Sequence, residues 1–189
     1  MSNRIAAIAR TTAAHVKPVA LPVLFSVLMW ASAAAGAVPI PGTPVPITLQ
    51  TMVVMLAGLM LTPSQAAMSV AMYLGAGAAG LPVFTGGMST AALISPTGGF
   101  LLGFLPGVVV IALLKGRRRA GSALWTVPRY ALASVAGGIL TVYAFGIVMQ
   151  SVLTGVPIAA IAVASAGFIV GDLVKAAVAS LTAAALNRR

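Results

Sequence analysis

Long apolar runs, separated by short segments rich in proline, glycine or basic residues, cover most of this chain. A helix needs about 20 residues to cross the roughly 30 Å hydrocarbon core of a bilayer, with about 17 at the short end. Runs near this length predict membrane-spanning helices. We expect six of them, over residues 19–37, 47–61, 64–79, 98–114, 130–153 and 168–186.

Proline and glycine define most of the boundaries between these runs. Four prolines between residues 38 and 47 prevent a helix there, because proline lacks an N–H and clashes with the preceding turn. Pro63 separates the second and third runs, and a segment rich in glycine and proline, residues 80–99, precedes the fourth.

The last apolar run is too long for one untilted crossing. It covers residues 157–186 and contains Gly167 and Gly171. We expect a short outer helix over residues 157–164, then a break, then the sixth span.

Composition excludes a soluble globular domain. Only 6% of residues are charged and 60% are hydrophobic, whereas an ordinary soluble domain is roughly 25% charged. A disordered chain is excluded as well, because the apolar content is high. We therefore expect an all-α integral membrane protein, with an amino-terminal tail over residues 1–17 and one membrane domain over residues 18–189.

The positions of the basic residues predict the orientation of the chain. Eleven Lys and Arg residues and one acidic residue give a net charge of +10. Ten of the cations fall into three groups. One is in the tail, one extends from the loop after the fourth span to the start of the fifth, and one is at the carboxy terminus. Lys and Arg concentrate in short cytoplasmic loops, so six spans place both termini in the cytoplasm and the uncharged loops 38–46, 80–97 and 154–167 outside. This distribution leaves no soluble basic face for nucleic acid.

The amino terminus also allows another interpretation. A basic segment over residues 4–17, an apolar run and small residues at 31–35 are similar to a secretory signal peptide. Its removal would leave five spans with the same cytoplasmic side. We favour six spans, because the basic region is long and small residues also suit helix packing.

The chain lacks the residues that most catalytic centres need. It has no cysteine, one histidine (His15) and one acid (Asp172), which leaves no ligand set for a protein-built metal centre. It also has no Gly-x-x-x-x-Gly-Lys-[Ser/Thr] loop for nucleotides. We expect no enzymatic activity, no metal and no cofactor.

Asp172 and Lys175 are a charged pair inside the sixth predicted span. Their spacing of three residues places both side chains on one helix face. Either charge alone near the middle of the membrane costs about 2.5–3.5 kcal/mol, and intramembrane ionisable residues are functional candidates by default. The pair offers a ligand one acceptor and one donor. The alternative is an ion pair that only locks two helices together.

Two uncharged polar clusters lie on the outer half of the predicted spans. The first contains Thr43, Thr48, Gln50 and Thr51. A Thr hydroxyl there either binds a ligand or only caps the helix, whereas the Gln50 amide gains nothing from lipid. The second contains Thr85, Ser89 and Thr90, followed by Gly98 and Gly99, where glycine permits either a close approach to a ligand or a tight turn.

Three motifs resemble the BioY family of biotin transporters. Residues 38–51 (VPIPGTPVPITLQT) resemble that family's first outer loop. Residues 80–84 (GLPVF) with 95–104 (SPTGGFLLGF), and then residues 171–176 (GDLVKA), are similar to its second and third signatures. The order and spacing match from about residue 18 to 186. Ser95 replaces the usual glycine, and the proline often found shortly before Gly-Asp is absent.

The resemblance implies a six-helix S component of an energy-coupling factor (ECF) transporter in the bacterial inner membrane. It implies biotin as ligand beneath the outer loops, and a transmembrane coupling protein and two ATPase subunits as partners. Solitary action or a homo-oligomer stays open. Together, the residues and the resemblance give these candidate substrate-binding residues: Asp172, Lys175, Gln50, Thr48, Thr43, Thr85, Ser89 and Gly98.

Two other functions are compatible with the residues. The first is a secondary carrier for another small carboxylate-bearing solute or vitamin, with Asp172 and Lys175 as a proton-coupled pair. The lack of an evident inverted repeat counts against it. The second is a membrane scaffold without transport, in which the pair is structural.

Overall fold

The computed structural model describes residues 19–116 and 123–186, and within these residues the regular structure is helical. The predicted tail (1–17), His15 and the Arg117–Arg119 cluster lie outside the described residues. The helices are Val19–Ala34, α2 (Gln50–Met60), α3 (Pro63–Ala78), α4 (Thr90–Leu93), α5 (Gly98–Leu114), α6 (Ala123–Ser134), α7 (Val142–Thr154) and α8 (Ile158–Leu186). A 3₁₀ turn, η1 (Thr85–Gly87), and a π-helical segment, η2 (Val135–Thr141), complete them.

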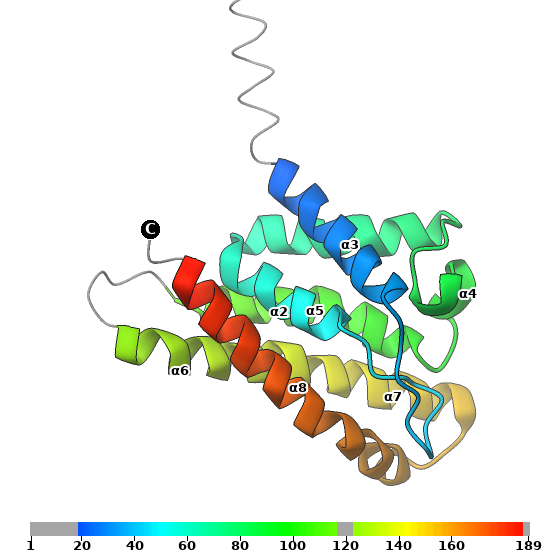
Figure 1. Ribbon diagram of the computed structural model, residues 1–189. Helices are drawn as coiled ribbons and strands as arrows, with labels where there is room; N and C mark the ends of the chain where they lie inside the picture. Colours follow the sequence, from blue (N-terminus) through cyan, green and yellow to red (C-terminus); the bar gives the residue numbers. More distant parts are fainter. Residues whose placement is uncertain (1–18, 117–122, 187–189) are drawn as a thin grey trace, which may run out of the picture.

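The long helices lie side by side and their connections gather at two ends (Figure 1). The start of α6 and the end of α8 lie at one end, on the left of the view. The loop that precedes α2, the short helix α4 and the connection between α7 and α8 lie at the opposite end. Val38 and Ile47 pair as an isolated antiparallel bridge, which closes the proline-rich loop into a hairpin.

The predicted break in the last apolar run is wrong. α8 is continuous from Ile158 to Leu186, and both Gly167 and Gly171 are accommodated in it without positive φ angles. At 1.5 Å per residue its 29 residues span about 44 Å. A helix of that length fits a bilayer by tilting, and α8 runs obliquely across its neighbours in Figure 1.

The predicted start of the fifth span is also wrong. α6 begins at Ala123 and continues through Pro128. Little more than one helical turn precedes the proline, so few backbone hydrogen bonds are lost there. The helix then passes through η2 into α7 without interruption, and the side chain of Thr141 donates to the carbonyl of Ala136, five residues earlier, at 2.9 Å.

Glycine brings α5 and η2 into close contact at the centre of the bundle. A Cβ atom on Gly107 would lie 2.6 Å from the Gly137 carbonyl oxygen, so only a residue without a side chain fits there. Small residues allow such close packing of helix backbones in membranes. The contact fixes the height at which α7 begins relative to α5.

Lys115 connects two helices at the far end of α5. Its ammonium group donates to the carbonyl oxygens of Gly58, at 3.0 Å, and Leu61. Burial lowers the pKa of Lys115 to about 8, which leaves it mostly protonated at neutral pH. A cation at this position satisfies carbonyls that the end of a helix leaves free, so Lys115 caps α2 in addition to marking the basic side of the chain.

The outward surface is largely apolar. Two continuous helical stretches, Trp125–Thr154 and Ile158–Leu186, are long and apolar enough to cross a membrane, and Val19–Ala34, α2 and α5 are shorter apolar helices. Leu132, Val152 and Val163 are 71–78% exposed on the helices that carry them. An apolar surface of this kind is stable against lipid and prone to association in water.

Candidate substrate-binding site

A cavity of about 260 Å³ lies where the proline-rich loop and the second loop meet α5, α7 and α8. Ligand pockets are mostly apolar with a few placed polar groups, and this cavity has that composition. Its polar lining residues are Thr48, Gln50, Thr51, Thr85, Thr97, Tyr143, Asp172 and Lys175. Most of the remaining wall is apolar and is formed by prolines, Val45, Ile47, Met88, Ala92, Val142 and the aromatic and leucine side chains of α5 and α8.

Asp172 and Lys175 form an ion pair one turn apart on α8. The Lys175 Nζ atom lies 2.8 Å from Asp172 Oδ1. Asp172 is only 3% exposed, and Lys175 is partly buried. A buried charge requires a partner and further hydrogen bonds, and both side chains have them.

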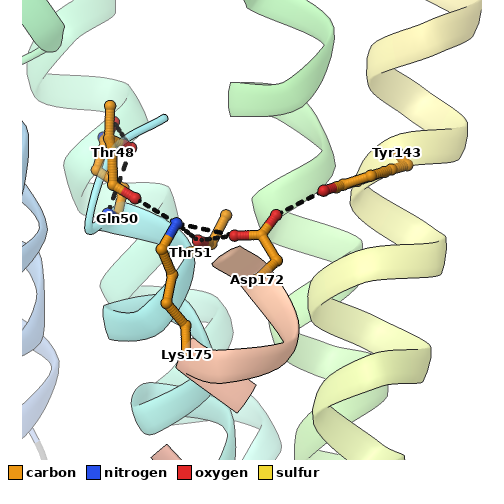
Figure 2. A network of polar contacts seen from close by, with 6 residues as sticks. All are labelled: Thr48, Gln50, Thr51, Tyr143, Asp172 and Lys175. Carbon is orange, nitrogen blue, oxygen red and sulfur yellow. Dashed lines mark hydrogen bonds and ion pairs between the residues drawn. The ribbon is translucent and has the colours of Figure 1, made fainter. Parts of the chain in front are cut away.

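The pair is surrounded by donors and acceptors from α2, the loop before it and α7 (Figure 2). Lys175 also donates to the Thr48 carbonyl oxygen at 2.7 Å and to Thr51 Oγ1 at 3.1 Å. The Thr51 hydroxyl donates to Asp172 Oδ1 at 2.9 Å. The Tyr143 hydroxyl reaches the other carboxylate oxygen, Oδ2, at 2.6 Å. Three helices, α2, α7 and α8, therefore meet at one carboxylate.

Gln50 is the centre of a second polar network. Its amide nitrogen donates to the Tyr73 hydroxyl at 2.5 Å, and its amide oxygen accepts from Thr48 and Thr85 at 3.2 and 3.1 Å. Tyr73 in turn donates to the Val83 carbonyl at 3.2 Å. These bonds hold the second loop against α2 and α3, so Gln50 shapes the cavity besides lining it.

Three aromatic rings, one from each of three helices, form part of the cavity wall. Phe100 of α5, Tyr143 of α7 and Phe168 of α8 meet edge to face, with ring centroids 6.1–6.4 Å apart. This arrangement is favoured by the quadrupoles of the rings. The Phe100 ring also fills the space left by the missing side chain of Gly146 on α7.

Substitution of Gly146 by alanine is expected to weaken both the fold and ligand binding, because the added Cβ overlaps the Phe100 ring. Overpacking of this kind costs about 1–3 kcal/mol. Gly75→Ala in α3 is the matched control: among the described residues, no heavy atom beyond its chain neighbours and its own helix backbone lies within 4 Å of the added Cβ, and the substitution should stabilise the helix slightly. Thermal unfolding in one detergent compares the two, and equal unfolding temperatures would contradict the proposed packing of Phe100.

Five of the eight candidate substrate-binding residues line the cavity together: Thr48, Gln50, Thr85, Asp172 and Lys175. The other three lie outside its lining. Thr43 accepts from the Val45 N–H at 3.2 Å inside the proline-rich loop, Ser89 precedes α4, and Gly98 begins α5 against the Leu93 carbonyl. Leu49 occupies the N-cap position of α2, while the Thr48 hydroxyl accepts from the Gln50 N–H at 3.4 Å, so Thr48 satisfies a donor at the start of the helix as well as lining the cavity.

Sequence reasoning did not place Tyr143, Thr97, Phe100 or Phe168 in the site. Thr51 belongs to the first polar cluster but was not among the candidates. Tyr143 has no sequence signal, because the π-helical segment before it breaks the helical period of 3.6 residues. Among the described residues, no group of three or more His, Cys, Asp or Glu side chains is placed to hold a metal ion.

Comparison with known proteins decides the family. A family model described as BioY family matches residues 5–189. The chain belongs to the BioY family. A protein from Rhizobium etli named biotin transporter BioY is 37% identical over 164 residues, which cover 85% of this chain and 88% of that protein. One from Thermotoga maritima with the same name is 38% identical, covering 79% of this chain and 85% of the relative.

The fold also matches a solved structure. The crystal structure described as the S-component for biotin from an ECF-type ABC transporter superposes with a TM-score of 0.85. It is 26% identical, and the match covers 93% of both chains. Membership of the BioY family, predicted from the three motifs, is therefore confirmed, as are the all-helical class and the resemblance to an S component. The relatives are transporters and not enzymes.

Proposed function

We propose that this protein binds biotin and mediates its uptake across the membrane. The observation that carries the proposal is the cavity of a BioY-family fold that buries Asp172 and Lys175 among apolar walls. Biotin combines a ureido ring, which has N–H donors and a carbonyl acceptor, with an apolar ring and an aliphatic acid. The Asp172 carboxylate is an acceptor for the ureido N–H groups, and the aromatic wall suits the apolar ring.

The substrate-binding residues belong to the same proposal. Asp172, Lys175, Thr48, Gln50 and Thr85 would bind or enclose biotin, since all line one cavity. For Thr43 and Ser89 we propose a supporting role in the loops. Gly98 would support the site at the start of α5, where a side chain would collide with the Leu93 carbonyl.

We further propose six spans in the bacterial inner membrane, with both termini cytoplasmic and residues 18–189 as one membrane domain. Six helical segments of at least 11 residues among the described residues support this number, with α6, η2 and α7 taken together as one of them. α2 has only 11 residues, so its crossing would be completed by the loop that precedes it. The cavity lies at the end of the bundle opposite to the start of α6 and the end of α8, which is the outer end in this orientation.

Energy for uptake would come from partner subunits. The sequence contains no nucleotide-binding loop, and the similar solved structure is described as a component of an ECF-type ABC transporter. We propose a transmembrane coupling protein and ATPase subunits as these partners. Transport by the chain alone, or as an oligomer of itself, is the competing mode.

Uptake of labelled biotin tests this function. Cells without biotin transport of their own would produce the chain alone, with the coupling protein and ATPases, or with ATPases that cannot hydrolyse ATP. We expect uptake only with the chain present, raised at least about 10-fold by active ATPases. Uptake that is independent of the chain would contradict the function, and equal uptake with inactive ATPases would contradict only the partners.

A further inference from the structure

We propose that Tyr143 is a positioning residue of the binding site, which orients Oδ2 of Asp172 as the acceptor for a ligand N–H group. The inference rests on the proposed binding of biotin, and it names an atom and a residue that the candidate set did not include.

All three protons of Lys175 are engaged within the protein. An ammonium group has three donors and no acceptor. Nζ has three acceptors around it: the Thr48 carbonyl at 2.7 Å, Asp172 Oδ1 at 2.8 Å and Thr51 Oγ1 at 3.1 Å. Lys175 therefore has no donor left for a ligand unless one of these bonds breaks. Through its bond to the Thr48 carbonyl, Lys175 connects α8 to the end of the loop before α2.

The two oxygens of Asp172 are used unequally. A carboxylate offers about four acceptor positions, two on each oxygen. Oδ1 accepts from both Lys175 and Thr51, which fills its two positions. Oδ2 accepts from Tyr143, which uses one of its two positions. The acceptor capacity that remains for a ligand is therefore on Oδ2, the atom that Tyr143 holds.

The direction of the Tyr143 hydroxyl is set by the fold. The ring packs edge to face against Phe100 and Phe168, with centroids 6.1 and 6.3 Å away, and the residue is 9% exposed. Tyr143 reaches the carboxylate from α7, on the side opposite to Thr51 and Lys175 (Figure 2). Held from both sides, the carboxylate cannot rotate freely about its terminal bond.

The position of Tyr143 depends in turn on η2. A π-helical segment contains more residues per turn than an α-helix, so it rotates the helix that follows relative to the one before. η2 ends at Thr141, immediately before the cavity residues Val142 and Tyr143. Its backbone is fixed by the close contact between Gly107 and Gly137. The irregular segment thus sets which face of α7 meets Asp172.

The pair also defines the ligand group that fits Oδ2. Asp172 and Lys175 neutralise each other, and Lys175 has no free N–H. A ligand carboxylate beside Oδ2 would face a negative charge without a donor, whereas a neutral N–H group gains a charge-assisted hydrogen bond. In biotin, the groups of this kind are the ureido N–H groups.

Infrared spectroscopy can test the role of Tyr143 directly, because Asp172 is the one acidic side chain in the sequence. Its carboxylate band is the band that disappears in Asp172→Asn. In ligand-free protein we expect Tyr143→Phe to shift this band. The matched control, Tyr73→Phe, removes a buried hydroxyl bonded to Gln50 and should leave it in place. Adding biotin to the wild-type protein should shift the band again.

Biotin affinity supplies the second measurement. Tyr143→Phe removes the hydrogen bond that orients the charged Oδ2 atom, and hydrogen bonds to charged groups are stronger than neutral ones, so it should weaken binding by roughly 10-fold or more. An unshifted band in Tyr143→Phe, or biotin binding without a band shift in the wild-type protein, would overturn the proposal. A wild-type protein that does not bind biotin would refute the proposed function, while the ligand-free spectra would still report whether Tyr143 holds Asp172.

Discussion

Asp172→Asn is expected to weaken biotin binding by roughly 100-fold or more. The amide keeps the shape of the carboxylate but removes its charge, and it leaves Lys175 buried beside a neutral group. Truncating one member of a buried, hydrogen-bonded charge pair at a binding site costs about 2–5 kcal/mol. The measurement is the dissociation constant for biotin, determined by calorimetry on purified protein in detergent.

Ser180→Ala is the matched control for that substitution. Ser180 is buried on the same helix, and its hydroxyl donates to the Ala176 carbonyl within α8 at 2.6 Å. We expect its affinity for biotin to stay within about 2-fold of the wild type, because it lies outside the cavity lining. If Asp172→Asn changed the affinity for biotin as little as this control does, the binding site would lie elsewhere in the protein. The family membership would be unaffected.

Lys175→Met is expected to destabilise the fold more than the double variant Asp172→Asn/Lys175→Met. The single substitution leaves a carboxylate that is 3% exposed without its cation, a change that costs about 3–5 kcal/mol, whereas replacement of both partners is often neutral. Apparent unfolding temperatures measured in one detergent provide the comparison. We expect Lys175→Met to unfold roughly 10 °C below the wild type and the double variant to unfold close to it.

The double variant also separates a binding site from a structural ion pair. If the pair binds the ligand, the double variant is stable but has lost most of its affinity for biotin. If the pair only locks helices together, a stable double variant binds biotin as well as the wild type does. Stability near the wild type with unchanged affinity would therefore contradict the binding role of Asp172 and Lys175.

The parts of the site that could be predicted from the sequence are those whose chemistry is unusual inside a membrane. Charged side chains and amides are costly in lipid, so Asp172, Lys175 and Gln50 stand out in any apolar run. That these three residues meet Thr48 in one cavity could be predicted only from the resemblance of the motifs to the BioY family. The span Gly98–Leu114 was predicted with the bounds that α5 has, because a glycine pair and a basic cluster enclose it.

The parts that could not be predicted depend on tertiary contacts. Tyr143 reaches Asp172 only because η2 changes the helical register, and Phe100 meets Phe168 across 68 positions of sequence. The break expected near Gly167 is absent, because glycine without a positive φ continues a helix that its neighbours support. Local propensity is a weak guide at such positions.

Equilibrium binding of biotin to the purified wild-type chain tests the central claim most directly. The account predicts saturable binding of one biotin per protein, with competition by ligands that keep the ureido group. A folded, monodisperse wild-type protein that shows no affinity for biotin, or that binds another small carboxylate-bearing solute in its place, would contradict it.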